Sequence, residues 1–188
     1  MLKSIRFSLV LLFLVGFGLS SCIDNESTVE AILIKDKEAI AEYLAENPLE
    51  GEKEFIDEFT GVHMFWHRVS ESEIKPEIGD TLSVDYVGKL LSNRVFDTSV
   101  EQIARDNDVY NENREYGPLR YRLSNQLQLI EGFESAVSLM EEGDSVTVIF
   151  PSIYGYGSAG SQGGPVPIPP NSPIIFGIEL LDIKKPTN

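Results

Sequence analysis

A period-two alternation of apolar and polar residues recurs along this chain and constrains its fold more than any other feature. It is clearest in 81–91 and 145–150, and the segments 62–69, 119–124 and 174–183 are also strand-like. Such alternation is typical of strands with one buried face. With 42% hydrophobic residues in 188, the chain has enough apolar side chains for a packed core. The pattern predicts a domain built on a sheet.

Two segments have helical spacing instead. Apolar residues between Val29 and Leu44 follow a helical stripe that Asn47-Pro48 ends, and 133–140 gives one face of a two-turn helix. We expect the first helix to dock on the domain or, alternatively, to form a dimer contact. Residues 49–60 are acidic and loop-like, and the polar segment 99–117 is interpreted as an insertion. Antiparallel strands with one short internal helix predict an α+β fold.

The first 21 residues predict a secretory signal. Lys3 and Arg6 precede an apolar run from Phe7 to Leu19, shorter than the about 20 residues that span a bilayer. A permanent transmembrane anchor is the alternative. The run ends in Leu19-Ser20-Ser21-Cys22, which resembles the lipobox of bacterial lipoproteins, and Cys22 is the only cysteine. We therefore expect acylation of Cys22, for example with palmitate, against the alternative of an incidental thiol.

This resemblance implies a location in the cell envelope. The protein is expected to be lipid-anchored through Cys22, at the outer membrane and facing the periplasm. The whole chain has a formal net charge of −15, and loss of residues 1–21 would remove two basic residues and no acid. An acidic surface repels phosphate backbones, so nucleic acid is not expected as a partner. It also repels anionic lipid, which leaves the acyl chains as the expected membrane anchor.

Three apparent binding motifs have the wrong context. The sequence 155–160 matches G-x-G-x-x-G, but it leads into a Gly/Pro-rich stretch instead of the helix that a dinucleotide site requires. His63 and His67 lack further ligands for zinc. The segment 106–113 lacks the glycine and the closing glutamate of a calcium loop. We expect neither a metal nor a cofactor.

Aromatic residues are spread over five short blocks between strands and loops, of which the block 96–99 is expected at a turn. These blocks are Val84-Asp85-Tyr86-Val87-Gly88, Phe96-Asp97-Thr98-Ser99, Leu129-Ile130-Glu131-Gly132-Phe133, Tyr154-Gly155-Tyr156-Gly157 and the stretch from Ile168 to Leu181. In this order they resemble the FKBP family of peptidyl-prolyl cis/trans isomerases, over about residues 60–184. The closing stretch, with Ile-Pro-Pro-Asn followed by Phe176, is the most specific block.

The resemblance implies an FKBP-like twisted antiparallel sheet of five to six strands wrapped around one short helix and preceded by an N-terminal helix. It implies isomerisation of X-Pro bonds in exported or envelope proteins, by non-covalent catalysis in an aromatic pocket. The expected organisation is a lipoprotein signal peptide at 1–21, a tether at 22–27, the N-terminal helix and acidic linker at 28–60, and the isomerase domain at 61–184.

The resemblance also implies roles for individual residues. The Tyr156 hydroxyl and the Ile130 backbone N–H would hold peptide carbonyls, and Asp97 would polarise or orient the twisted amide. The expected substrate-binding residues are Tyr86, Phe96, Leu119, Leu129, Phe133, Ile168 and Phe176. Tyr86 and Tyr156 each carry a hydroxyl that needs a partner when buried, which argues against their being ordinary core residues.

The sequence departs from the family pattern at three places. Phe133 replaces a tryptophan, Leu119 stands where an aromatic residue is frequent, and the insertion 99–117 lengthens a loop beside Phe96-Asp97. We expect the insertion to act as a flap at the pocket mouth. Two other functions remain open: a non-catalytic binder of proline segments, as chaperone or assembly subunit of a gliding-motility or secretion apparatus, and a purely structural envelope protein.

Overall fold

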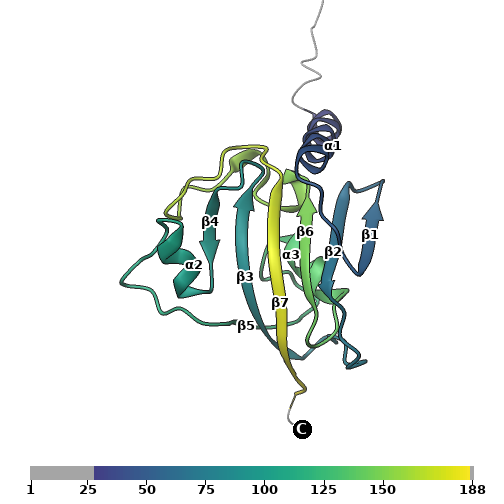
Figure 1. Ribbon diagram of the computed structural model, residues 1–188, viewed down its shortest axis with the longest axis vertical. Coiled ribbons are helices and arrows are strands. Elements are labelled where there is room, and N and C mark those ends of the chain that lie inside the picture. Colours follow the sequence, from purple (N-terminus) through teal and green to yellow (C-terminus); the bar gives the residue numbers. More distant parts are fainter. Residues whose placement is uncertain (1–27, 187–188) are drawn as a thin grey trace, which may run out of the picture.

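A seven-stranded antiparallel sheet organises the computed structural model, which describes residues 28–186. The strand order is β1-β2-β6-β7-β3-β4, and β5 pairs with β3 beside β4 (Figure 1). The helices and strands, in chain order, are α1 (Val29–Glu46), β1 (Lys53–Asp57), β2 (Val62–Arg68), β3 (Thr81–Leu90), β4 (Val95–Thr98), α2 (Glu101–Asp106), β5 (Leu119–Arg122), α3 (Glu131–Ser138), β6 (Ser145–Phe150), the 3₁₀ turns η2 (Ser152–Tyr154) and η3 (Gly157–Ala159), and β7 (Ile174–Lys184).

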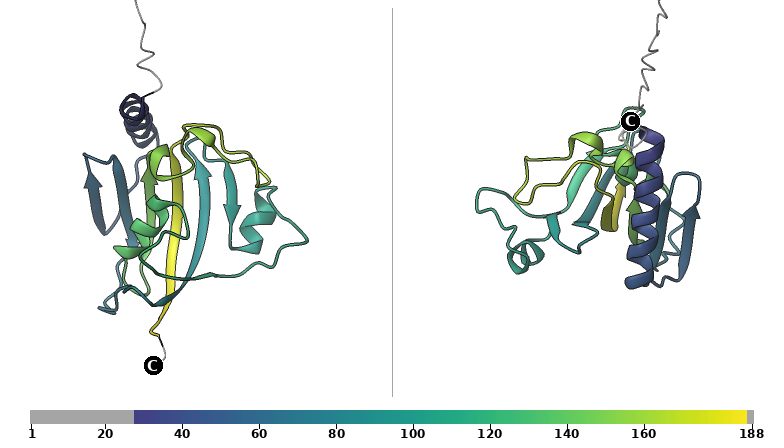
Figure 2. Two further views of the ribbon diagram at one scale, coloured as in Figure 1. Left: turned by 180° about the vertical axis from the view of Figure 1, so that it is seen from behind. Right: turned by 90° about the horizontal axis from the view of Figure 1, so that it is seen from above.

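The main core lies between one face of the sheet and the short helix α3, which crosses that face in the left view of Figure 2. Alternation along β6 turns Val146, Val148 and Phe150 toward this core. Phe133 and Val137 of α3 are buried against them. The approach is close, because a Cβ added at Gly132 of α3 would lie 2.5 Å from the Phe150 ring.

Helix α1 lies across one end of the sheet, as the right view of Figure 2 shows. Its residue Ile40 is fully buried in a second, smaller apolar cluster with Ile149 of β6 and Ile175 of β7. These two isoleucines are cross-strand partners and face away from the α3 core. The helix begins after Thr28, whose side-chain oxygen accepts a hydrogen bond from the Ala31 N–H at 3.2 Å. The structure thus docks α1 on the domain.

The fold class predicted from the sequence is confirmed, with two corrections. The segment 49–60 was expected to be a loop, but it contains β1, which pairs with β2 from Lys53↔Trp66 to Asp57↔Val62. Four of the five β1 residues are exposed, so the strand has no buried face and lacks the alternation that signals one. The block at Phe96-Asp97-Thr98 was expected at a turn, but it forms β4, which pairs with β3. The sheet therefore has seven strands instead of five or six.

The insertion 99–117 is an ordered lobe closed at its base by a hydrogen bond from the Gly117 N–H to the Ser99 carbonyl at 2.9 Å. It contains the helix α2 and contributes Ala104 and Val109 to the main core. In Figure 1 this lobe lies at the sheet edge opposite to the β1–β2 hairpin. The predicted signal peptide, the tether and Cys22 lie outside the described residues. No helix among residues 28–186 is long and apolar enough to cross a membrane.

Candidate functional site

The pairing of β3 with β4 brings Tyr86 and Asp97 together. The Tyr86 hydroxyl donates to Asp97 Oδ2 at 2.6 Å, and the Thr98 N–H donates to Asp97 Oδ1 at 2.9 Å. The end of β4 is fixed on β3 because the Thr98 hydroxyl donates to the Tyr86 carbonyl at 2.7 Å and Ser99 Oγ accepts from the Tyr86 N–H at 2.9 Å. Asp97 is therefore held in one orientation by groups of its own sheet.

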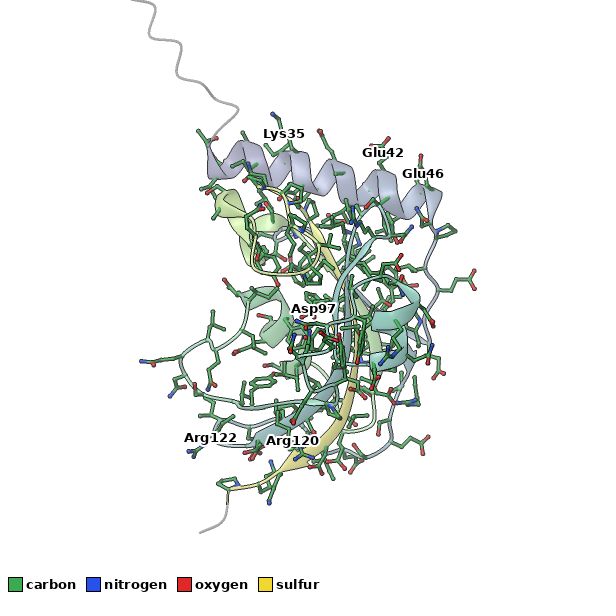
Figure 3. The ribbon with its side chains drawn as sticks, turned by 90° about the vertical axis from the view of Figure 1, so that its left-hand side faces the viewer. Lys35, Glu42, Glu46, Asp97, Arg120 and Arg122 are labelled. Atoms are coloured by element: carbon green, nitrogen blue, oxygen red, sulfur yellow. The ribbon has the colours of Figure 1, made fainter. Side chains whose placement is uncertain are left out.

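Arg114 of the insertion lobe completes this arrangement. Its guanidinium forms an ion pair with Asp97 Oδ1 and donates to the Tyr86 hydroxyl oxygen at 3.0 Å. Figure 3 looks at the molecule from the side of the lobe and shows Asp97 near the middle of this face, below α1 and above Arg120. The lobe thus bonds directly to two residues of the candidate site. The expected role, a flap at the pocket mouth, included no such contact.

Four aromatic rings surround Tyr86 and Asp97 on the core side. Phe176 of β7 is central: its ring centroid lies 5.1 Å from that of Phe133, 5.7 Å from Phe96 and 6.0 Å from Tyr86, each pair edge to face. The Phe96 ring also meets the Tyr156 ring edge to face at 6.1 Å. Edge-to-face pairs are the preferred arrangement of aromatic rings. They fix the wall of the site without polar bonds.

Glu134 shapes the loop that precedes α3. This side chain is 4% exposed, and its Oε1 accepts from the Gln128 N–H at 2.7 Å and the Leu129 N–H at 2.8 Å. The next residue, Ile130, is the N-cap of α3, and its carbonyl accepts from the Phe133 and Glu134 amides. The Ile130 N–H donates to no group within residues 28–186. It is available to a ligand.

Tyr156 follows η2 in the loop between β6 and β7. Burial raises the pKa of the Tyr156 hydroxyl, and the negative charge of Asp97 raises it further. Burial also raises the pKa of Tyr86, as does its hydrogen bond to Asp97. Both phenols therefore keep their protons at neutral pH and can act as donors. The Tyr156 hydroxyl has no hydrogen-bond partner in the part of the chain that the structure describes.

These groups line one cavity of about 360 Å³. Its walls are Tyr86, Asp97, Leu119, Gln128, Leu129, Ile130, Phe133, Tyr156 and Phe176. Eight of the ten residues expected at the site from the sequence belong to this set. Gln128 does not come from the sequence blocks; it lies three residues before the first residue of α3 and carries no local signal of its own.

Phe96 and Ile168, the other two expected residues, line an adjoining cavity of about 310 Å³. The two cavities share Asp97 and Tyr156. The Phe96 side chain is 3% exposed and acts in the first cavity only by supporting Phe176 and Tyr156. The second cavity is walled on one side by the insertion lobe, through Val109, Asn111 and Arg114.

Two of the apparent binding motifs have ordinary local structure. The G-x-G-x-x-G match contains only the short turn η3, so it presents no helix N-terminus to a phosphate. The His67 ring makes a hydrogen bond with Thr147 at 2.8 Å, and His63 lies elsewhere on the same strand. Within residues 28–186 no group of His, Cys, Asp and Glu side chains could hold a metal ion.

Comparisons with known proteins agree with this geometry. The sequence model of a family described as FKBP-type peptidyl-prolyl cis-trans isomerase matches residues 72–181. A short-type peptidyl-prolyl cis-trans isomerase of Methanocaldococcus jannaschii is 44% identical over 79 residues, which are 42% of this chain and 49% of the relative. FK506-binding protein 2 of Candida glabrata is 34% identical over 118 residues, which are 62% of this chain and 74% of the relative.

Solved structures show the same similarity. The crystal structure of FkpA from Escherichia coli aligns with a TM-score of 0.59 at 26% identity, over 83% of this chain and 62% of that one. A peptidyl-prolyl cis-trans isomerase from Pseudomonas syringae aligns with a TM-score of 0.57 at 25% identity, over 85% of this chain and 98% of that one. The chain covers 49%, 35% and 33% of the lengths of the first three curated relatives, so it spans less than half of each.

Proposed function

The chain belongs to the FKBP-type peptidyl-prolyl cis-trans isomerase family, and from this premise we propose that it isomerises X-Pro bonds of polypeptides in the cavity between α3 and the sheet. One observation carries the proposal. Two donors without a partner among the described residues, the Ile130 N–H and the Tyr156 hydroxyl, line the same aromatic cavity. A bound peptide offers two acceptors of the required kind, the carbonyls that flank the proline.

The proposed mechanism requires no covalent step. Rotation about an amide C–N bond costs about 18–20 kcal/mol because the twisted state loses resonance. The twisted amide has a less polar carbonyl than the planar one, so an aromatic cavity from which water is excluded favours it over the ground state. Each ~1.4 kcal/mol of this preference gives a tenfold gain in rate. In this mechanism Tyr156 and Ile130 hold the flanking carbonyls.

In this proposal Asp97 acts less directly than Tyr156 and Ile130, because it does not hold a peptide carbonyl. Its two oxygens already accept bonds from Tyr86, Thr98 and Arg114. The carboxylate therefore orients the Tyr86 ring and, with the Arg114 guanidinium that pairs with it, gives the cavity wall a fixed arrangement of charges close to the rotating amide. Electrostatic groups that are held in place before the reaction stabilise a twisted state without reorganising.

A protease-coupled assay on a panel of X-Pro tetrapeptides tests the activity, together with a direct measurement of peptide binding. Wild-type protein is expected to accelerate exchange between the cis and trans forms. Asp97→Asn is expected to lower kcat/KM while leaving the protein folded. A non-catalytic binder of proline segments would bind the same peptides and leave their exchange rate unchanged, and that result would overturn the enzymatic proposal.

The proposed setting is the bacterial cell envelope, with Cys22 acylated and the domain facing the periplasm. The support is the lipobox-like Leu19-Ser20-Ser21-Cys22 after a short apolar run. Clients would then be exported proteins that need proline isomerisation. Cys22→Ser is expected to abolish incorporation of labelled fatty acid and to leave residues 1–21 attached. Labelling of this variant would show that the lipoprotein assignment is wrong.

A further inference from the structure

Asp36 is a buried carboxylate that lies outside the candidate site. It projects from α1 and is 3% exposed. Its Oδ2 accepts two hydrogen bonds from one residue, from the Ser152 N–H at 2.8 Å and from the Ser152 hydroxyl at 2.5 Å. A buried carboxylate is costly unless its hydrogen bonds are made. The residue pair Asp36–Ser152 therefore indicates a specific role, since an apolar residue would fill the same space at a lower cost.

Ser152 begins the segment that carries Tyr156. It is 0% exposed and is the first residue of η2. The first N–H groups of a helical turn have no acceptor within the turn, and here the acceptor for Ser152 is supplied by α1. The Ser152 carbonyl in turn accepts from the Gly155 N–H at 2.9 Å, one residue before Tyr156. A continuous set of bonds therefore connects α1 to the backbone of Tyr156.

The position of Asp36 is fixed by contacts that do not involve η2. One helical turn further along α1, Ile40 is buried between Ile149 and Ile175. The Tyr43 hydroxyl donates to Asn93 Oδ1 at 2.7 Å, in the turn between β3 and β4. In Figure 3 the labelled side chains of Lys35, Glu42 and Glu46 point away from the sheet. Asp36 and Ile40 therefore form the face by which α1 is attached.

We propose that Asp36 is a positioning residue for the isomerase site: by holding Ser152 it sets the place of the Tyr156 hydroxyl in the cavity. This inference rests on the proposed function and deepens it. It makes α1, which precedes the segment 72–181 matched by the family model, a working part of the site. The carboxylate acts through Ser152 and has no contact with the cavity itself.

A double-mutant cycle on kcat/KM tests this coupling. Asp36→Ala is expected to lower kcat/KM about two- to tenfold when Tyr156 is present, and by less than about twofold in the Tyr156→Phe background, since contacting or connected residues are not additive. Asp36→Asn retains an acceptor for Ser152 and is expected to restore most of the rate. An equal loss from Asp36→Ala in both backgrounds would overturn the proposal.

Loss of folded protein is separated from loss of positioning by a matched control on the same helix. Ile40→Val loosens the attachment of α1 without touching Ser152. Each rate is divided by the folded fraction measured by near-UV circular dichroism. Ile40→Val is then expected to give the wild-type rate. A loss equal to that of Asp36→Ala would show that attachment of α1 matters and the carboxylate does not, which contradicts the proposal.

A second readout is independent of catalysis. The backbone amide resonances of Gly155, Tyr156 and Gly157 are measured by NMR in the full chain. Asp36→Ala is expected to shift all three, and Ile40→Val to leave them in place. If wild-type protein isomerises no peptide, the proposed function fails and these resonances still decide the inference. Unshifted resonances in Asp36→Ala would sink the positioning role whatever the activity.

Discussion

Tyr154 and Tyr156 stand two residues apart in one loop, yet only Tyr156 lines the main cavity. Tyr156→Phe keeps the ring and removes one hydroxyl. A net hydrogen bond is worth about 0.5–1.5 kcal/mol, so kcat/KM is expected to fall about two- to twelvefold. Tyr154→Phe is the matched control and should leave kcat/KM unchanged in the same peptide assay. Equal behaviour of the two variants would rule out a specific role for the Tyr156 hydroxyl.

Phe176 is the residue on which the aromatic wall depends, since three other rings of the site contact it. Phe176→Ala is expected to lower the free energy of unfolding by about 3–5 kcal/mol, because a buried ring is removed and a cavity is left. Urea unfolding followed by fluorescence measures this loss. Phe176→Leu fills more of the space and should lose less. An unchanged midpoint for Phe176→Ala would mean that the wall collapses around the gap.

Asp36 also makes the free energy of unfolding depend on pH. Burial raises the pKa of this carboxyl above its ordinary value of 3.8, although the hydrogen bonds from Ser152 oppose the rise. The folded chain then holds the proton more tightly, so this contribution to stability is present below pH 3.8 and is lost as the pH rises through the folded pKa. The Asp36→Asn variant has no titratable group at this position, so its stability lacks this pH-dependent contribution.

The corresponding measurement is urea unfolding of wild type and Asp36→Asn across the acid range. The free energy of unfolding of wild type minus that of the variant is expected to fall as the pH rises above 3.8 and then to level off. All other groups titrate in both proteins and cancel in the difference. A difference that stays constant with pH would show that the Asp36 carboxyl titrates alike in the folded and unfolded chains.

Among the larger elements, the insertion lobe has its own internal order. The Arg105 guanidinium lies 3.5 Å from the centre of the Tyr110 ring, and the Tyr110 ring stacks on Tyr116 at 5.5 Å. Arg105 is in turn paired with Glu101. This stack leads to the chain segment that carries Arg114, which reaches Asp97. The lobe is therefore built to present one guanidinium to the site.

Tyr110→Ala interrupts the stack at an exposed position that lines neither cavity. The expected loss of unfolding free energy is about 1–2 kcal/mol, from one ring pair and one cation–π contact. Hydrogen exchange of residues 101–116 should accelerate while that of the sheet stays the same. Tyr110→Phe keeps the ring and is the control. Unchanged exchange in the alanine variant would mean that Ala104 and Val109 hold the lobe alone.

The elements also show what could be predicted from the sequence. The strands β6, β3, β2 and β7 were predicted because each places alternate apolar residues in the α3 core, although β6 and β7 also bury Ile149 and Ile175 on the opposite face, under α1. β1 lacks a buried face, and α2 lies in a segment rich in polar residues, so neither could be recognised. The family resemblance supplied every residue that lines the main cavity except Gln128.

The parts of the site that could not be predicted depend on long-range packing. Arg114 and Asp36 bond to Asp97 and Ser152 across 17 and 116 positions of sequence, and Gln128 lies in a loop that is fixed by the buried Glu134 of α3. Asp36 and Ser152 are separated by 116 positions, and no local spacing connects them. Only the folded chain shows that α1 and the loop before Tyr156 share one carboxylate.

At the scale of the whole molecule, α1 is expected to be part of the stable unit. A chain that begins at Leu49 leaves Ile149 and Ile175 without Ile40 and leaves the Ser152 donors without their acceptor. Because burial of one large aliphatic side chain contributes about 1.5–3 kcal/mol, the truncated chain should lose at least that much unfolding free energy. The urea midpoint should fall, and the m-value should be smaller because unfolding of the shorter chain exposes less surface.

Ile40→Ala in the full chain is the companion to this truncation. It removes the central contact of α1 but keeps Asp36, and it is expected to cost about 2–5 kcal/mol. A truncated chain as stable as the full one would show that the sheet and α3 fold independently of α1. In that case the positioning role of Asp36 could affect only the local geometry of the loop.

The closeness of aromatic rings to the backbone also limits how this sequence can diverge. A Cβ at Gly88 would lie 2.5 Å from the Phe96 ring and 2.8 Å from the Phe176 ring, and one at Gly132 would meet Phe150. Alanine at either position therefore requires a large ring to shift or to be replaced, which makes a second, compensating mutation favourable. Substitution of other cavity-lining residues, such as Gln128 and Leu119, does not push a new Cβ into an aromatic ring. If the proposed function holds, descendants of this chain can change which polypeptides they accept much more readily than they can change the aromatic floor of the cavity.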